Sequence, residues 1–213
     1  MFADYQRLMR LWYEQDLSCS DGDPCSSNST ASLIERDIEQ AFMRAQSSVA
    51  AELLNLVHAR EPAFFERLVI DVLLAMGYGS RRRDSARRLG RTGDGGVDGI
   101  ISQDELGLDQ IYLQAKRIKP GCLVPISDVR DFAGSLDAHH ASKGVFLTTS
   151  HFSQGAVNFC QQVSRRVVLV DGEKFAELMV RYNIGVSVKH SYQIKRIDPE
   201  YFRRDPQRCS TSK

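Results

Sequence analysis

The stretch that decides the fold is residues 93–99, Gly-Asp-Gly-Gly-Val-Asp-Gly, followed after a polar turn by residues 110–117, Gln-Ile-Tyr-Leu-Gln-Ala-Lys-Arg. Branched and aromatic residues bounded by glycine and aspartate predict two strands, over residues 97–102 and 110–117. The segment between them, residues 104–109, reads Asp-Glu-Leu-Gly-Leu-Asp, which is typical of a turn. We therefore expect a β-hairpin here.

The centre of that turn decides which side chains of the hairpin meet. If Leu106 is the centre, Asp98 lies directly opposite Gln114, with their Cβ atoms about 4.5–5.5 Å apart on one face. Side chains alternate along a strand, so Lys116 shares that face. Three neighbours turn to the other face: Ile111, Leu113 and Ala115.

A carboxylate, an amide carbonyl and a lysine on one strand face are what metal-dependent cleavage of a phosphodiester requires. One divalent cation could bridge the Asp98 carboxylate, the Gln114 side-chain carbonyl and the Ala115 backbone carbonyl. Oxygen ligands of this kind suit Mg²⁺, with Mn²⁺ as a substitute. Lys116 would orient or deprotonate the attacking water, or neutralise the charge of the pentavalent transition state.

The rest of the chain alternates between helical and strand patterns. Apolar residues at helical spacing predict helices over residues 32–59, 62–76, 126–139, 153–164 and 172–182. Continuous apolar runs predict buried strands over residues 143–149 and 166–170. Helices and strands in this order predict an α/β fold with a mixed β-sheet flanked by helices on both faces, preceded by a helical N-terminal segment.

The amino-acid composition indicates the broad class of protein but does not indicate what the protein binds. The 213 residues are 42% hydrophobic and 26% charged, with a net charge of +1, as in ordinary globular domains. No apolar run approaches the ~20 residues of a membrane span, so no membrane partner is expected. The five cysteines are scattered without a Cys-x-x-Cys spacing, which favours reduced thiols and a cytoplasmic location over a zinc or disulfide framework.

Glu66 is a further candidate for the site. It lies next to the apolar stripe of the helix expected over residues 62–76, so its carboxylate could point under the sheet towards the cation. It could equally be a solvated glutamate near a helix start, where the helix dipole favours an acid.

Arginines gather around the hairpin, where they would suit contact with phosphate groups. The same residues could instead form a solvated loop, and the pattern does not decide between the two. The candidate DNA contacts are Arg81, Arg82, Arg83, Arg91, Arg117 and Arg130.

Six motifs together resemble the catalytic domain of the Mrr restriction endonucleases. They are residues 65–69, 74–78, 93–99, 114–117, 144–150 and 168–172. The resemblance runs from about residue 33 to about residue 202. It implies the PD-(D/E)xK nuclease fold, in the variant where glutamine, here Gln114, replaces the usual acid.

The resemblance also implies an activity, namely Mg²⁺-dependent cleavage of DNA, often methylated, in bacterial restriction. It assigns catalytic roles to Asp98, Gln114 and Lys116 and strengthens the case for Glu66. Double-stranded DNA is the implied partner, and a homodimer would most simply cut both strands. Such an enzyme would lie in the bacterial cytoplasm, on the nucleoid when it is bound to DNA.

The expected organisation has four parts. Residues 1–31 form an atypical N-terminal segment and polar linker, 32–60 a long connecting helix, 61–202 the nuclease domain and 203–213 a polar tail. Residues 1–31 are too short for the winged-helix domain that precedes the Mrr catalytic domain, so a separate DNA-recognition subunit is one expectation. A catalytically silent DNA-binding or assembly module, and a junction-resolving or repair nuclease, remain as alternatives.

Overall fold

The computed structural model describes residues 29–79, 86–88, 96–163 and 165–203. The chain divides into two compact units, Met1–Arg44 and Ala45–Lys213. Helix α2 (Ser29–His58) crosses this boundary, and the expected helix over residues 32–59 is thereby confirmed. Residues 1–28 of the expected N-terminal segment and linker lie outside the described residues, whereas residues 29–31 belong to α2.

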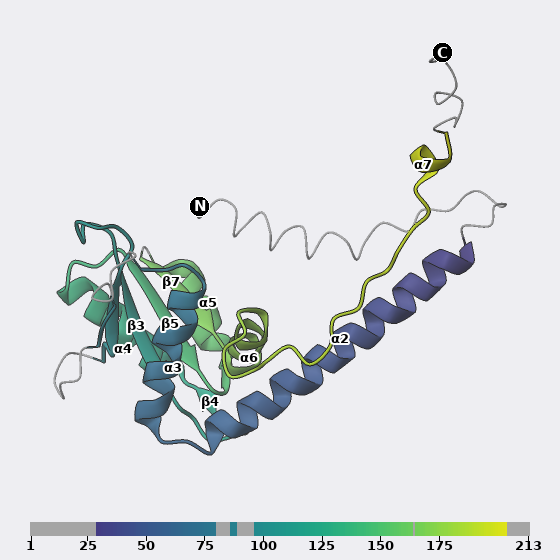
Figure 1. The fold of residues 1–213 in the computed structure, drawn as a ribbon. Coiled ribbons are helices and arrows are strands. Elements are labelled where there is room, and N and C mark those ends of the chain that lie inside the picture. Colours follow the sequence, from purple (N-terminus) through teal and green to yellow (C-terminus); the bar gives the residue numbers. More distant parts are fainter. Residues whose placement is uncertain (1–28, 80–85, 89–95, 164, 204–213) are drawn as a thin grey trace, which may run out of the picture. The chain divides into compact units, whose positions relative to one another are not determined.

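The second unit is built on a five-stranded mixed sheet with the strand order β1-β2-β3-β5-β7. Figure 1 labels three of these strands, β3, β5 and β7. These strands are β1 (Ala86–Arg88), β2 (Gly99–Ser102), β3 (Gln110–Lys116), β5 (Lys143–Thr148) and β7 (Arg166–Val170). The first three are antiparallel neighbours, whereas β3, β5 and β7 run parallel. Parallel neighbours need a crossover connection, and helices α4 (Ile126–Ala138) and α5 (Gln154–Gln162) supply the two that are required.

Helices cover both faces of the sheet, which confirms the expected fold class. One core joins the end of α2 with α3 (Pro62–Ala75) and α6 (Gly172–Arg181), and its fully buried rings Phe65 and Phe175 meet edge to face at 5.3 Å. The other core joins α4 and α5, where Phe132 packs edge to face on Phe146 of β5. Such edge-to-face ring pairs add to the stabilisation from burial.

The two cores show which way each side chain of β3 points. Ile111 and Leu113 are buried in the core of α3 and α6, and Ala115 packs against it. Tyr112 is buried in the core of α4 and α5. Because side chains alternate, Gln114 and Lys116 lie on the Tyr112 face, towards α4, as the sequence predicts.

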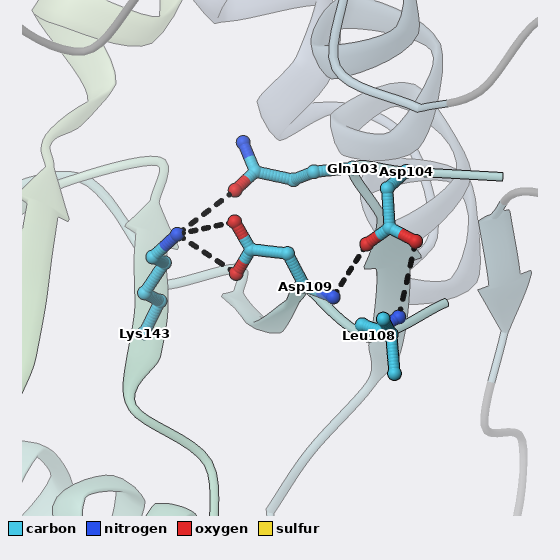
Figure 2. A network of polar contacts seen from close by, with 5 residues as sticks. All are labelled: Gln103, Asp104, Leu108, Asp109 and Lys143. Atoms are coloured by element: carbon cyan, nitrogen blue, oxygen red, sulfur yellow. Dashed lines mark hydrogen bonds and ion pairs between the residues drawn. The ribbon is translucent and has the colours of Figure 1, made fainter. Parts of the chain in front are cut away.

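The loop between β2 and β3 is held by a polar network (Figure 2). The Asp104 carboxylate accepts hydrogen bonds from the backbone N–H groups of Asp109 and Leu108, at 2.5 and 3.1 Å. The Asp109 N–H is the main reason that the pKa of the Asp104 carboxyl lies below its ordinary value. On the neighbouring strand, the Lys143 ammonium binds the Asp109 carboxylate at 2.6 Å and the Gln103 side-chain oxygen at 3.2 Å. The loop is thereby tied to β5 and closes on itself.

Several elements differ from expectation at their ends or were missed. Strand β2 begins at Gly99 instead of at residue 97, because the chain turns at Gly96, whose φ is +86°. Strand β1 lies in the arginine-rich stretch, where apolar and polar residues do not alternate in the way that predicts a strand. The other missed elements are short: β4 (Leu123–Val124), β6 (His151–Phe152) and α7 (Pro199–Arg203). No helix of the described part is long and apolar enough to cross a membrane.

Replacing Gly172 with alanine should destabilise the fold. A Cβ built there lies 2.5 Å from the carbonyl oxygen of Thr149, a backbone atom that cannot swing away. We expect the free energy of unfolding in urea to fall by about 1–3 kcal/mol, as for other overpacked sites. Gly134→Ala is the control, because Gly134 is exposed on α4 with no atom within 4 Å of the new Cβ. It should stabilise by roughly 0.5–1 kcal/mol. A Gly172→Ala protein as stable as wild type would contradict the close packing.

Candidate active site

Asp98 sits where the β2–β3 ladder opens. The ladder pairs Gly99 with Leu113 and Ile100 with Tyr112, which confirms the register expected for a hairpin centred on Leu106. Asp98 precedes the first ladder pair. Its N–H donates to the Leu113 carbonyl at 2.8 Å, and its Oδ2 accepts from the Ala115 N–H at 2.8 Å. The carboxylate is thus fixed against the end of β3.

The side chain of Gln114 packs on the backbone of Gly96. A Cβ on Gly96 would lie 3.2 Å from Gln114 Nε2 and 3.3 Å from Oε1, so glycine leaves the space that the amide fills. Gln114 Oε1 is buried and has no hydrogen-bond partner in the part of the chain that the structure describes. A buried carbonyl oxygen without a partner costs about 1–3 kcal/mol, so the site favours a donor or a cation at this oxygen.

Lys116 is fixed at both ends. Its backbone carbonyl accepts a hydrogen bond from the Thr148 hydroxyl at 2.9 Å, and its ammonium pairs with Oδ2 of Asp128 in the first turn of α4. Sequence reasoning missed Asp128. An acid in the first turn of a helix is favoured by the helix dipole alone, so its position gave no separate signal of a role in the site.

Buried hydroxyl groups at the end of β5 hold the chain that leaves β3. Thr149 Oγ1 both accepts from the Ile118 N–H, at 3.0 Å, and donates to the Ile118 carbonyl, at 2.9 Å. The Ser150 hydroxyl donates to the Cys122 carbonyl. These contacts explain why polar side chains are buried here, and they fix where β3 ends.

Glu66 is half-buried on α3, next to the fully buried Phe65. Helix α3 packs on the core that contains Leu113 and adjoins Ala115. Glu66 therefore comes from the helix on the Ala115 side of β3, whereas Gln114 and Lys116 face α4. Its role in the site stays a prediction.

The structure places two of the candidate DNA-binding arginines. Arg117 donates from Nη1 to the carbonyl of His58 at 3.1 Å, so it ties the end of α2 to the end of β3. The guanidinium of Arg130 lies 5.5 Å from the ring centre of Phe159, between α4 and α5. The other four lie outside the described residues: Arg81, Arg82, Arg83 and Arg91. A DNA-binding role stays a prediction for all six.

The charged form of the His58 imidazole is disfavoured next to Arg117. Burial lowers the pKa of its imidazole below 6.5, a backbone hydrogen bond with Thr149 opposes this shift, and the Arg117 guanidinium adds to it. His58 Nδ1 and Arg117 Nε are both buried without a hydrogen-bond partner among the described residues. Burial and the neighbouring Arg117 guanidinium therefore favour the neutral imidazole at the junction of α2 and β3.

The described residues offer no cluster of acids or histidines to a cation at the Asp98–Gln114 end of the hairpin. Within the described ranges, no three His, Cys, Asp or Glu side chains come together in a way that would hold a metal ion. The oxygens that these described residues could add to the Asp98 carboxylate are the amide and backbone oxygens expected for Gln114 and Ala115.

A comparison with known protein families agrees with the geometry of the site around Asp98, Gln114 and Lys116. Residues 57–179 match the family model Mrr_cat, described as restriction endonuclease. The chain belongs to this family. The matched segment of this Mrr_cat protein contains Asp98, Gln114, Lys116 and Asp128, and the resemblance seen in the sequence is thereby confirmed.

A relative of known activity matches most of the Mrr_cat chain. The type IV methyl-directed restriction enzyme EcoKMrr of Escherichia coli strain K12 is 41% identical over 165 residues, which are 78% of this chain and 53% of the relative. The chain therefore spans about half the length of that enzyme.

Two solved restriction endonucleases match the chain. The DNA modification-dependent restriction endonuclease AspBHI matches with a TM-score of 0.50 at 20% identity, over 67% of this chain and 37% of its own. The MspJI restriction endonuclease in complex with a 27-mer oligonucleotide matches with a TM-score of 0.39 at 24% identity, over 78% of this chain and 35% of its own. The AspBHI match supports the restriction-endonuclease fold of this Mrr_cat chain.

Gly96→Ala should disturb the site as well as the backbone. Alanine at a positive φ costs about 1–2 kcal/mol, and the new Cβ would push the Gln114 amide. We expect a lower unfolding temperature and a weaker rise of that temperature on adding Mg²⁺. Gly107→Ala is the matched control, because its φ of +73° brings a similar strain while its Cβ stays 3.7 Å or more from any atom. Equal Mg²⁺ responses in the two variants would contradict the role of the Gly96–Gln114 contact.

His58 should make stability fall in mild acid. The unfolded chain takes up a proton at His58 as the pH falls through about 6.5, whereas the folded chain does so only at a lower pH. Its contribution to stability is therefore complete above pH ~6.5 and is lost as the pH falls through the folded pKa. Urea unfolding at pH 7.5 and 5.5 should show a smaller loss in His58→Gln than in wild type. The exposed His190 gives the control, His190→Gln, which should behave as wild type. The same loss in all three proteins would contradict this linkage.

Proposed function

We propose that this chain is a divalent-cation-dependent endonuclease that hydrolyses phosphodiester bonds in DNA. The observation that carries the proposal is the buried Oε1 of Gln114, which has no hydrogen-bond partner among the described residues. Gln114 shares a strand face with Lys116 and precedes Ala115, whose N–H binds the Asp98 carboxylate. Membership of the restriction endonuclease family supports the same activity.

The side chains at this end of the hairpin fit a Mg²⁺ ion, with Mn²⁺ as a substitute. Asp98 and Gln114 Oε1 would hold it, with the Ala115 carbonyl as a third oxygen, and hard cations of this kind prefer oxygen ligands. When bound, such an ion lowers the pKa of a coordinated water and neutralises charge on the phosphate.

The protein side chains prepare the reaction by their fixed positions. The Ala115 N–H holds the Asp98 carboxylate in place, so little reorientation is needed when a cation arrives. Lys116 lies on the same face and would stabilise the negative charge that develops on the phosphate, or guide the attacking water. Glu66 would approach from α3 and orient a water from the other side.

The proposed substrate is double-stranded DNA, with a preference for methylated sites. The name of the E. coli relative, a methyl-directed enzyme, supports this preference. Two copies of the chain would cut the two strands, and a separate subunit or domain would read the sequence. The candidate arginines, among them Arg117 and Arg130, would contact phosphate groups.

Plasmid nicking gives the direct test. With Mg²⁺, wild type should cut methylated plasmid faster than unmethylated plasmid, and EDTA should stop both reactions. Asp98→Ala, Gln114→Ala and Lys116→Ala should each lower the rate at least ~100-fold, the scale of a lost acid–base or charge-stabilising group. Lys189→Ala, at an exposed residue of the C-terminal segment, is the control and should cut as wild type does.

The outcomes separate the candidate functions. Equal activity in wild type and the three site variants would end this mechanism. DNA binding without cleavage in Mg²⁺ or Mn²⁺ would favour a silent DNA-binding module. Faster cleavage of branched than of linear DNA would favour a junction-resolving nuclease.

A further inference from the structure

We propose that Asp128 is the positioning residue of Lys116 and holds its ammonium group in the orientation that cleavage requires. This inference rests on the proposed function, since it concerns a side chain of the same site. Asp128 does not touch the substrate in this proposal. It acts through Lys116.

In the part of the chain that the structure describes, the Asp128 carboxylate contacts a side chain of strand β3 and not its own helix. Asp128 lies in the first turn of α4, where a carboxylate ordinarily binds the free N–H groups of its own helix. Among the described residues, however, its contact is the ion pair with Lys116 Nζ. The next residue, Val129, is fully buried in the core of α4 and α5, so Asp128 stands on a rigid support.

The carboxylate of this ion pair is less exposed than those of three other lysine and arginine pairs among the described residues. The Lys116 side chain is 41% exposed, but that of Asp128 is only 19% exposed. The carboxylates paired with Lys143, Lys174 and Arg165 are 46%, 61% and 62% exposed. Exposed pairs contribute little because water screens them and their long side chains stay mobile. The shielded carboxylate of Asp128 is better placed to restrict the lysine.

A lysine needs such a restraint to act at one point. Its four-carbon stem is flexible, and its ammonium carries three donors that rotate freely. The ladder with β5 and the Thr148 hydroxyl fix the backbone of Lys116, and Asp128 fixes the far end. One donor is then taken by Asp128 and two remain for the phosphate or the attacking water. Small losses of position at a reacting group cost large factors in rate.

The test compares turnover, DNA binding and coupling. In Asp128→Asn, kcat for plasmid nicking should fall about 10–100-fold, while KM and the Kd for DNA without divalent cation stay unchanged or decrease, because a negative charge near the phosphates is gone. Asp128→Glu keeps the charge and should recover part of kcat. Asp131→Asn is the matched control, because Asp131 is exposed on the same helix and its substitution removes the same charge. It should stay within about twofold of wild type.

A double-mutant cycle with Lys116→Ala, in single-turnover reactions, shows whether Asp128 acts through the lysine. Adding Asp128→Asn to Lys116→Ala should change the rate by less than about twofold. Independent, multiplying losses would overturn the proposal, as would an Asp128→Asn kcat equal to or above wild type. A rise in kcat would mean that Asp128 withholds the lysine from the phosphate.

Two further results keep the readings apart. Circular dichroism and thermal unfolding check that each variant folds. If Asp128→Asn does not fold, Asp128→Glu becomes the deciding variant. An Asp128→Glu protein with the kcat and DNA binding of wild type would then overturn positioning by this close contact. If Lys116→Ala itself cuts as wild type does, the proposed nuclease mechanism fails. If Lys116→Ala is inactive while both Asp128 variants match wild type, only the positioning role fails.

Discussion

The pairing of β2 with β3 is the constraint on which the candidate site depends. Gly99 stands opposite Leu113, and Asp98, the residue before Gly99, meets the end of β3. A shift of one residue would turn Gln114 and Lys116 into the apolar core, because side chains alternate between faces. Buried Ile111 and Leu113 oppose such a shift from within the sheet.

The site gathers where several elements end together. Strands β3 and β5 run parallel, so their carboxyl ends lie side by side, and ligands of open α/β sheets commonly bind at that edge. The Thr148 hydroxyl joins the two ends, and Asp128 reaches in from the first turn of α4. Rigid strands and a helix, more than loops, thus carry the groups that would do the chemistry.

The sequence predicted what depends on local pattern and left out what depends on distant contacts. The register followed from alternation along β3 together with the assumption that Leu106 is the centre of the turn, and the structure confirms it. Helical spacing predicted the helices on both faces. Strand β1 escaped because Ala86–Arg88 has no apolar alternation. The Arg117–His58 and Lys116–Asp128 contacts join residues that only the folded chain brings together, so no spacing could announce them.

Ala115 shows that the middle residue of the Gln-x-Lys motif is more than a spacer. Its methyl group packs against the core of α3 and α6, its N–H binds Asp98, and it stands opposite Leu147 of β5. A larger side chain would have to displace buried neighbours, and a proline would remove the N–H. A genome search for the motif should therefore gain selectivity by admitting only small, non-proline residues between glutamine and lysine.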